Sequence, residues 1–550
     1  MKITNNSRYS YDTLYGQIRL DDWPWESEIN EDFWDYYTSP ELQRLREVRL
    51  CNINSLFLPG GANIDRFEHA LGTYYLAKEC LKNWPALDKI TPEQKRNFLV
   101  GALFHDFKTS AFGHSVQYIE EKEGFKHEGD FFAAIRPGIT EPIEPEEGDE
   151  ADSSYEYNMA STDPVYVGRT PKLNTLLTNE ALEDVGSLIN GDGKLGPLIS
   201  SDMDLDNIDN VFRLAYHIGL TNDTETPLQL AKALYIEDGK KVVPSEKIHL
   251  VKKWWKVREK LYKYLLLNPG EFSGKCMLTE TVAFAKRQDY TLTWNKVDRE
   301  LIDSLRQRPN YEKDDLPIYQ FEFQDEGLSG IPKSVPEFVT NSFEDNKISL
   351  NESVEIEKHE RGYALLESNR QFLLEREGDM LKVYRIGVES YSIQDTISRL
   401  MVGELYGCLS ILSITGELES LDRLFDKFNN LDWRLEKSRE LSAKLPDDLW
   451  SLRIQTRFHP IRDVDKTRRT VNLQLPTGEA KEVGDSSQRV LIGVFAANNN
   501  LTIHDIEELP REKRVRLETQ ITEFVQSLAD EINTGIKVMT LETYGESKDE

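Results

Sequence analysis

Apolar residues recur with a helical period through most of the first 290 positions of the chain. A period of 3.6 residues gathers them on one face, which a helix then buries against its neighbours. This pattern predicts helices over the ranges 32–50, 66–81, 92–106, 195–220 and 248–286. Pro269 and Gly270 predict a break in the last of them. A weak alternation over 11–20 predicts a short strand or hairpin.

The pattern becomes mixed beyond about residue 306. Strand-like pieces among charged residues fill 353–386, and a pair of helices is expected over 393–428. A small sheet and an amphipathic helix packed on it are expected from the ranges 453–458, 469–475, 489–497 and 514–532. We therefore expect a mainly α core over 1–305, followed by an α+β region over 306–550 with a small antiparallel sheet. Regulation or oligomerisation is the role expected of that second region.

An acidic stretch interrupts the predicted core at about 137–165. It is dense in Glu, Asp and Pro and has little apolar surface to bury, so we interpret it as an exposed insertion.

An apolar run at 98–104 ends abruptly in His105 and Asp106. A helix that is apolar nearly all round is buried, so its end places an imidazole and a carboxylate in a low-dielectric environment. Burying a carboxylate without a partner is costly, and a cation or a cationic side chain should therefore lie beside it. A lone His-Asp pair is more often a core histidine bonded to its neighbour, so the rest of the chain has to decide.

Further residues of metal-binding type support a site. Four of the nine histidines fall between residues 69 and 127, each with an acid or an arginine close by in sequence. The helix predicted over 195–220 carries a polar stripe formed by Asp206, Asn210, Arg213 and His217. Together, His69, His105, Asp106 and a later helical aspartate offer two nitrogens and two oxygens. This set suits iron, manganese, zinc or nickel. Such an ion polarises a phosphoryl oxygen or lowers the pKa of a bound water.

Composition and charge narrow the class of protein. At 550 residues with 39% hydrophobic content, the chain can build two or three folded domains. Its net charge of −29 argues against broad binding to nucleic acid, although a local cationic pocket would still take a phosphorylated ligand. No apolar run approaches the roughly 20 residues of a membrane span. The first residues lack an apolar signal core and the four cysteines are scattered, so we expect a cytoplasmic protein with reduced thiols.

The polar stretches of the first half form an ordered set of motifs. They lie at 39–46, 58–61 with 66–72, 105–106 with 112–114, 125–128, 204–209 with Arg213, and 258–262. In this order they resemble the HD superfamily of phosphohydrolases, and within it the deoxynucleoside triphosphate (dNTP) triphosphohydrolases. Bacterial dGTPases and the human enzyme with SAM and HD domains belong to that group. The resemblance covers roughly residues 8 to 290, and several motifs in one order are far more specific than an isolated HD pair.

The resemblance implies a role for individual residues. One divalent transition metal, either Mn, Fe, Zn or Ni, would be bound by His69, His105, Asp106 and Asp206. Asp202 and Asp209 lie on the same helical face and are the rival choices for the fourth ligand. A Mg²⁺ ion on the substrate phosphates is also expected.

The same resemblance places the catalytic and substrate-binding groups. His127, as the main proton-transfer group, and His114 would flank the phosphate under attack, and Arg66 would hold phosphates. Substrate binding is expected from Arg66, Lys108, Asn210, Arg258 and Tyr262. Lys108 is a cation that the family pattern does not include.

Several positions depart from the family pattern. They are Thr109 for a His, Gln117 for an Asp, Asn207 for a Lys, Asn210 for a Tyr, Leu214 for a sugar-contacting Asp and Leu266 for a Tyr. The metal ligands therefore match better than the positions for proton transfer and sugar recognition.

The function implied by the resemblance is metal-dependent hydrolysis of dNTPs to deoxynucleoside and triphosphate. A homo-oligomer, a nucleotide effector and, by analogy, a part in antiviral defence against phage are also implied. Two other classes stay open. One is an HD phosphodiesterase or phosphatase that acts on another nucleotide, and the other is a nucleotide sensor with weak turnover.

Overall fold

The computed structural model of the chain describes a defined set of residues. These are 8–20, 33–51, 63–85, 87–113, 115–116, 173–288, 290–293, 295–309, 311–312, 319–322, 343–344, 347–348, 355–359, 362–367, 370–377, 380–386, 390–445, 454–497 and 509–541. The motif residues 58–61 and the predicted insertion at 137–165 lie outside them.

The chain divides into two compact units. The first comprises Met1–Lys286, Tyr290–Arg306 and Thr396–Glu550, and the second comprises Arg287–Asp289 and Gln307–Asp395. The first unit therefore contains both the helical core and the last third of the chain.

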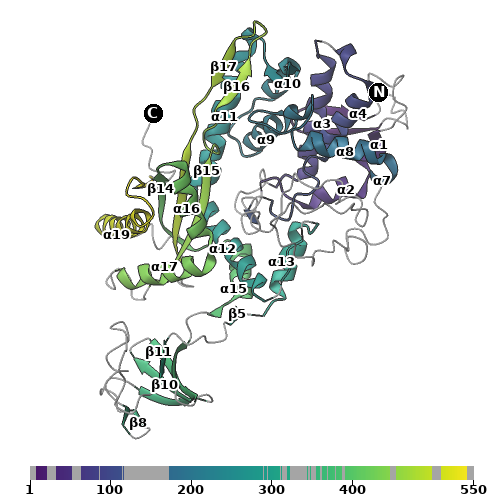
Figure 1. The fold of residues 1–550 in the computed structure, drawn as a ribbon. Coiled ribbons are helices and arrows are strands. Elements are labelled where there is room, and N and C mark those ends of the chain that lie inside the picture. The colour runs from purple at the N-terminus through teal and green to yellow at the C-terminus, as the bar shows by residue number, and fades with distance from the viewer. Residues whose placement is uncertain are drawn as a thin grey trace. The chain divides into compact units, whose positions relative to one another are not determined.

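Helix α3 (Arg66–Lys82) is at the centre of the helical core and packs against α4 (Pro92–Phe104) and α9 (Leu205–His217) (Figure 1). Three further helices close this core, namely α8 (Asn179–Ile189) against α4, α10 (Glu225–Ala233) against α3, and α11 (Ile248–Leu267) against α9. The helices carry a continuous cluster of buried apolar side chains.

Local sequence sets where the three central helices begin. The side chains of Asp65 and Asp204 each accept a backbone N–H three residues further on, and so cap α3 and α9. Thr91 and Gln94 form a capping box ahead of α4. The helices predicted over 66–81 and 92–106 are confirmed. The one predicted over 195–220 begins only at Leu205.

The N-terminal part consists of a hairpin and short helices. The hairpin predicted over 11–20 is confirmed as β1 (Tyr9–Asp12) paired with β2 (Gly16–Arg19). The single helix predicted over 32–50 is wrong, because it divides into α1 (Phe33–Tyr37), α2 (Pro40–Gln43) and the 3-10 helix η1 (Arg44–Glu47). Pro40 disfavours the helical conformation at Ser39, which is extended and caps α2 instead.

The remaining helical elements of this half are short or follow α11. The short ones are η3 (Leu87–Lys89), α7 (Leu173–Leu176), η4 (Gly196–Leu198) and η5 (Ser245–Lys247). The predicted break at Pro269 is confirmed, because α11 ends at Leu267 and α12 (Pro269–Lys286) begins there. Helix α13 (Asp298–Arg306) follows.

A four-stranded antiparallel sheet organises the last third of the chain. Its strand order is β15 (Thr456–Val464), β18 (Gln488–Ala496), β14 (Gly407–Thr415) and β19 (Lys537–Thr540). One face packs against α16 (Leu418–Asn429), α17 (Leu431–Lys444) and α19 (Arg511–Asp530). Phe272 of α12 contacts Phe495 and His459, whose neighbours face those helices, so α12 covers the opposite face.

The pair of helices predicted over 393–428 is wrong in its middle. The stretch contains α15 (Ile393–Val402), then strand β14, and only then α16. Strand β14 is buried on both faces, from Leu409 through Ile414. Ser410 and Ser413 separate its apolar residues, whose spacing does not alternate strictly, so periodicity does not distinguish this strand from a buried helix.

A second sheet joins the two halves of the first unit. Its strand order is β17 (Ala480–Val483), β16 (Val471–Gln474), β4 (Lys240–Val242) and β3 (Tyr235–Glu237). Strand β16 pairs with β4 in parallel at Gln474 and Val242. The hairpin β16–β17 therefore packs on the helical core, and Val471, Leu473 and Val483 belong to its apolar cluster.

The second unit is built from strands. A five-stranded antiparallel sheet has the order β6 (Tyr319–Glu322), β12 (Met380–Ile386), β11 (Arg370–Glu377), β10 (Gly362–Glu367) and β9 (Glu355–His359). Two small pairs are β5 (Tyr311–Glu312) with β13 (Ser390–Tyr391), and β7 (Phe343–Glu344) with β8 (Lys347–Ile348).

The expected fold class, a mainly α core followed by an α+β region with a small antiparallel sheet, is confirmed. Among the described helices, none has the length and apolar content needed to cross a membrane.

Candidate metal centre

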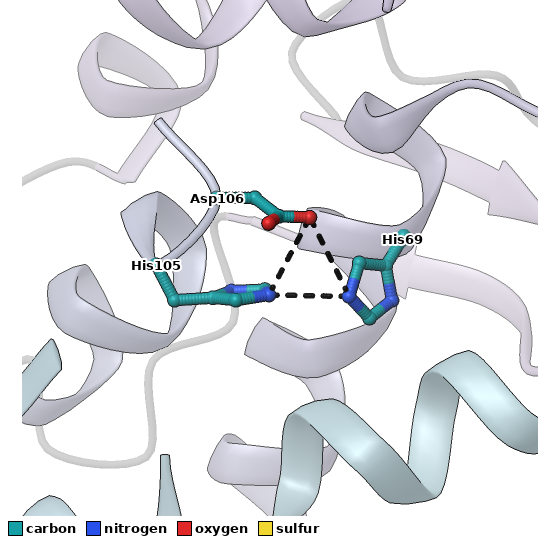
Figure 2. Close-up of side chains that lie close together, drawn as sticks. All are labelled: His69, His105 and Asp106. Atoms are coloured by element: carbon teal, nitrogen blue, oxygen red, sulfur yellow. Dashed lines mark hydrogen bonds and ion pairs between the residues drawn. The ribbon is translucent and has the colours of Figure 1, made fainter. Parts of the chain in front are cut away.

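Three of the predicted metal ligands meet at one point in the helical core. His69 belongs to α3, His105 caps the end of α4, and Asp106 follows in the next turn. One ligand atom from each lies within 4.8 Å of the other two, and all three residues are buried. Figure 2 shows the three side chains pointing toward a common centre.

The distances within this group suit a shared cation. Nε2 of His69 lies 3.1 Å from Nε2 of His105, and each nitrogen lies 3.8 Å from Oδ2 of Asp106. Imidazole nitrogens and carboxylate oxygens are ligands that divalent transition metals accept. The group can therefore supply three ligand atoms to one metal ion.

Asp206, in the first turn of α9, brings a second carboxylate to the same two rings. Its Oδ1 lies 2.9 Å from Nε2 of His69 and 3.5 Å from Nε2 of His105. The side chain of Asp206 is 30% exposed, against 8% for Asp106, so Asp206 is the most exposed of the four side chains.

The two rival aspartates lie elsewhere. Oδ2 of Asp209 lies 2.6 Å from Nδ1 of His69, on the side of the ring away from His105. Asp202 pairs with Lys241 and accepts the backbone N–H of Asn472 at 2.8 Å. This geometry favours Asp206 over both as the fourth ligand.

Hydrogen bonds fix which nitrogen each histidine ring presents. Nδ1 of His105 donates to the carbonyl oxygen of Ala102 at 2.9 Å, and Nδ1 of His69 donates to the carboxylate of Asp209. A ring that donates through Nδ1 keeps its lone pair on Nε2. The two facing Nε2 atoms therefore need a cation, either a proton or a metal ion, between or beside them.

Neighbouring charges favour the ionised forms of both histidines and of Asp106. Burial alone would lower the pKa of His69, but its hydrogen bonds to Asp206 and Asp209 outweigh burial and raise the pKa to about 10. Burial opposes a raised pKa at His105 too, and the charges of Asp106 and Asp206 outweigh it. Burial would raise the pKa of Asp106, but Arg66 and the two histidines hold it far below its usual range.

The charges around the ligands do not balance when the two histidines are neutral. Most of these charged groups are buried, and Glu68 and Asp206 are partly exposed. Two guanidinium groups, those of Arg66 and Arg213, face the five carboxylates of Asp12, Glu68, Asp106, Asp206 and Asp209. With His69 and His105 neutral, as metal binding requires, this cluster has an excess of three negative charges in the described part of the chain. Uncompensated charge is costly in a buried site. A divalent cation would offset most of the excess, so both the donor set and the charge fit a metal ion.

The predicted phosphate ligand Arg66 is bound to a metal-ligand candidate. Its Nη1 lies 2.6 Å from Oδ2 of Asp106, and Oγ1 of Thr109 donates to Oδ1 of the same carboxylate at 2.9 Å. Arg44 donates through Nη2 to the carbonyl oxygens of Phe107 and Thr109, at 2.7 Å each. The loop that follows the ligands is thus fixed from two sides, and Lys108 lies half-buried within it.

Arg258 is bound to the region after residue 306. It donates through Nη1 to the carbonyl oxygen of Lys466 at 2.7 Å and through Nη2 to that of Asp465 at 2.9 Å. Its guanidinium also lies 4.5 Å from the ring centre of Tyr262. Phosphate binding by Arg258 and Tyr262 stays a prediction.

Three more residues were predicted to act at the site, namely Asn210, His114 and His127. Asn210 lies one helical turn beyond Asp206, and its buried Oδ1 has no hydrogen-bond partner among the described residues. His114 and His127 lie outside the described residues, so their catalytic roles stay predictions.

Sequence reasoning missed the residues that support the ligands. Gly72 lies where α3 meets α9, and a Cβ atom there would collide with Arg213 and Asp209. Asp298 accepts the backbone N–H groups of Phe112 and Arg49, at 2.7 and 3.1 Å. A glycine inside an otherwise helical stretch was the available signal for Gly72. Asp298 gave no such signal.

Comparison with known proteins gives distant relatives. No protein-family model matches the chain. An uncharacterized protein of Mycoplasma pneumoniae is 27% identical over 223 residues, which cover 38% of this chain and 44% of that protein. An uncharacterized protein of Methanocaldococcus jannaschii is 24% identical over 54% of this chain and 55% of its own. The protein YwfO of Bacillus subtilis, also uncharacterized, is 23% identical over 46% and 52%. The chain spans about half the length of the curated relatives it matches.

Two solved structures are similar to this chain over most of its length. One is a phosphohydrolase from Bacteroides thetaiotaomicron, with a TM-score of 0.49 and 13% identity over 89% of this chain and 99% of that one. The other is a hypothetical protein from Aquifex aeolicus, with a TM-score of 0.49 and 13% identity over 94% and 100%.

Proposed function

We propose that the chain is a metal-dependent phosphohydrolase that cleaves deoxynucleoside triphosphates into deoxynucleoside and triphosphate. The observation that carries this proposal is the convergence of His69, His105 and Asp106, with ligand atoms within 4.8 Å of one another. Asp206 is the proposed fourth ligand, because its Oδ1 lies closest to the same two ring nitrogens.

The choice of substrate is supported by the ordered motifs of the first half of the chain. They resemble the dNTP triphosphohydrolases at the proposed ligands and at the arginine one helical turn before His69. Since the motifs at the sugar-contacting positions depart from that family, the type of base and sugar is left to the experiment.

A divalent ion bound by these residues would polarise a phosphoryl oxygen and lower the pKa of a bound water. The chain itself orients the ion's ligands, because Ala102 and Asp209 fix the two rings, and Arg66 and Thr109 fix Asp106. The exposed side near Asp206 is where a substrate phosphate can approach.

The bond that breaks decides between this function and its alternatives. If water attacks the α-phosphorus, the bond to the 5′ oxygen of the sugar breaks and the leaving oxygen takes up a proton. The products are then deoxynucleoside and tripolyphosphate. Attack with loss of pyrophosphate would instead leave a deoxynucleoside monophosphate, which is a different chemistry.

The proposed function is tested by metal analysis of the purified protein together with product chromatography on all four dNTPs. We expect about one equivalent of a transition metal, and deoxynucleoside with tripolyphosphate as products. Asp106→Asn should lose the metal and the activity and still fold. Asp192→Asn, at an exposed position, is the matched control and should keep both.

Other product patterns would refute the proposal. Nucleoside monophosphate with pyrophosphate would point to another hydrolase chemistry. Nucleotide binding without any product would favour a sensor. Stoichiometric metal in Asp106→Asn would refute the ligand assignment itself.

A further inference from the structure

Asp209 lies between a proposed metal ligand and a buried arginine. Its Oδ2 accepts Nδ1–H of His69 at 2.6 Å and Nε–H of Arg213 at 2.8 Å. Its Oδ1 accepts from Nη2 of Arg213 at 2.9 Å. The side chains of Asp209 and Arg213 have no exposed surface. Two hydrogen bonds from Arg213 therefore fix the carboxylate that accepts from the His69 ring.

The N-terminal hairpin completes this contact from a distant part of the sequence. The hydroxyl of Tyr15 donates to Oδ1 of Asp209 at 2.8 Å. Asp12 forms an ion pair with Arg213, in which Oδ2 lies 2.9 Å from Nη2, and its Oδ1 accepts the backbone N–H groups of Leu14 and Tyr15. The turn between β1 and β2 thus binds both members of the Asp209–Arg213 pair.

Packing leaves this network little freedom. Gly72 lies directly against Arg213 and Asp209, and a side chain at this position would occupy their space. The remaining Nη1 of Arg213 donates to Oε1 of Glu68 at 2.8 Å. Buried ion pairs can often be replaced by apolar residues without loss of stability. Stability alone therefore gives no reason for such a cluster beside His69.

We infer that Asp209 is a positioning residue for His69, and that Arg213 and the hairpin residues Asp12 and Tyr15 form part of the metal centre by holding Asp209. The inference rests on the proposed function only in requiring that a metal ion binds at His69. It assigns a role in metal affinity to the hairpin, whose residues Asp12 and Tyr15 lie more than 50 positions before His69, the first proposed ligand in the sequence.

The physical effect follows from the hydrogen bond to Nδ1. A carboxylate that accepts from Nδ1 keeps the lone pair on Nε2, fixes the plane of the ring and makes Nε2 more basic. Loss of a partner of this kind typically costs about 10- to 100-fold in metal affinity. Tyr15 supports Asp209 alongside Arg213, so its loss should cost less than the loss of the carboxylate.

The test measures the affinity for Co²⁺ and Mn²⁺ by competition with a chelator, together with the visible spectrum of the Co²⁺-loaded protein. Asp209→Asn should bind both ions about 10- to 100-fold more weakly, with a changed Co²⁺ spectrum. Tyr15→Phe removes one hydrogen bond to Asp209 and should bind them about three- to tenfold more weakly. The matched control is Tyr11→Phe, in the same hairpin and 70% exposed, which should bind like the unmodified protein.

Two results would overturn the inference. One is unchanged affinity and an unchanged Co²⁺ spectrum in Tyr15→Phe. The other is a lower melting temperature in that variant with no change in affinity, since this would show a merely structural role. Tyr15→Phe decides the matter even if Asp209→Asn fails to fold. Chelator competition and the Co²⁺ spectrum report metal binding and not hydrolysis. A protein that binds metal without cleaving dNTPs would therefore refute only the proposed function.

Discussion

Nη1 of Arg66 lies 2.6 Å from Oδ2 of Asp106, the carboxylate oxygen that also faces both histidine rings. Sequence motifs imply a phosphate-binding role for Arg66, whereas its position makes it first a partner of a metal-ligand candidate. Burial works to raise the pKa of Asp106, and Arg66 is the largest influence in the opposite direction. Arg66 therefore keeps this carboxylate ionised and available to a metal.

Arg66→Ala should make metal binding more sensitive to acid. Without the guanidinium the pKa of Asp106 rises, so protons compete with the metal for the carboxylate at higher pH. A neighbouring arginine typically lowers the pKa of an aspartate by about 1–3 units. We expect the pH of half-maximal metal release to rise by about one unit or more. Arg66→Lys keeps the positive charge and should shift it less. An equal release pH in all three proteins would contradict this account.

Gly72→Ala should destabilise the protein and weaken metal binding together. The added Cβ would collide with Arg213 and Asp209, and overpacking typically costs about 1–3 kcal/mol. Displacing Asp209 also removes the support of His69. Urea unfolding and chelator competition measure the two effects. Gly101→Ala is the matched helical control, because its nearest neighbour is the movable Cδ1 of Ile199 at 3.1 Å. A stable Gly72→Ala protein with normal metal affinity would contradict the prediction.

Arg258→Ala should act mainly on stability. Its two terminal nitrogens donate to the carbonyl oxygens of Asp465 and Lys466, and hydrogen bonds to charged groups contribute about 1.5–3 kcal/mol each. We expect the free energy of unfolding to fall by about 3 kcal/mol, with turnover per folded molecule reduced less than about tenfold. Urea unfolding and active-site titration by metal content check this. A hundredfold loss of turnover at unchanged stability would instead support a phosphate-binding role.

His459 should make the protein less stable in mild acid. Burial, together with Arg434 and Lys275, holds the pKa of His459 well below its usual range. The folded state therefore resists protonation while the unfolded state, with a pKa of about 6.5, accepts it. The contribution of His459 to the free energy of unfolding is fully present above about pH 6.5. Below that pH the contribution falls by about 1.4 kcal/mol per pH unit.

Urea unfolding at about pH 7.5 and 5.5 tests this effect, as a difference between variants of about 1.4 kcal/mol. His459→Gln should lose this part of the pH dependence. The exposed His249, changed to Gln, is the control and should keep it. The same pH dependence in His459→Gln and the unmodified protein would contradict the prediction.

Residues close together in sequence were predictable from local physics. The helix starts predicted at Arg66 and Pro92 and the break at Pro269 depend on neighbouring residues only, and the structure has them where the pattern predicts. Strand β14 was not predictable, because the helices that contact it, α12 and α19, lie far from it in sequence and bury it from both sides. The spacing of its apolar residues is compatible with either a strand or a buried helix until those partners are known.

The sequence by itself determined which residues could bind a metal, namely His69, His105 and Asp106 together with the aspartates Asp202, Asp206 and Asp209. Only the tertiary structure decided what each aspartate does. Helix α9 packs against α3 at Gly72, which turns Asp206 toward Nε2 of His69 and Asp209 toward Nδ1 of the same ring. Helical periodicity cannot make this distinction, because it places side chains on a face but does not set the angle at which two helices pack.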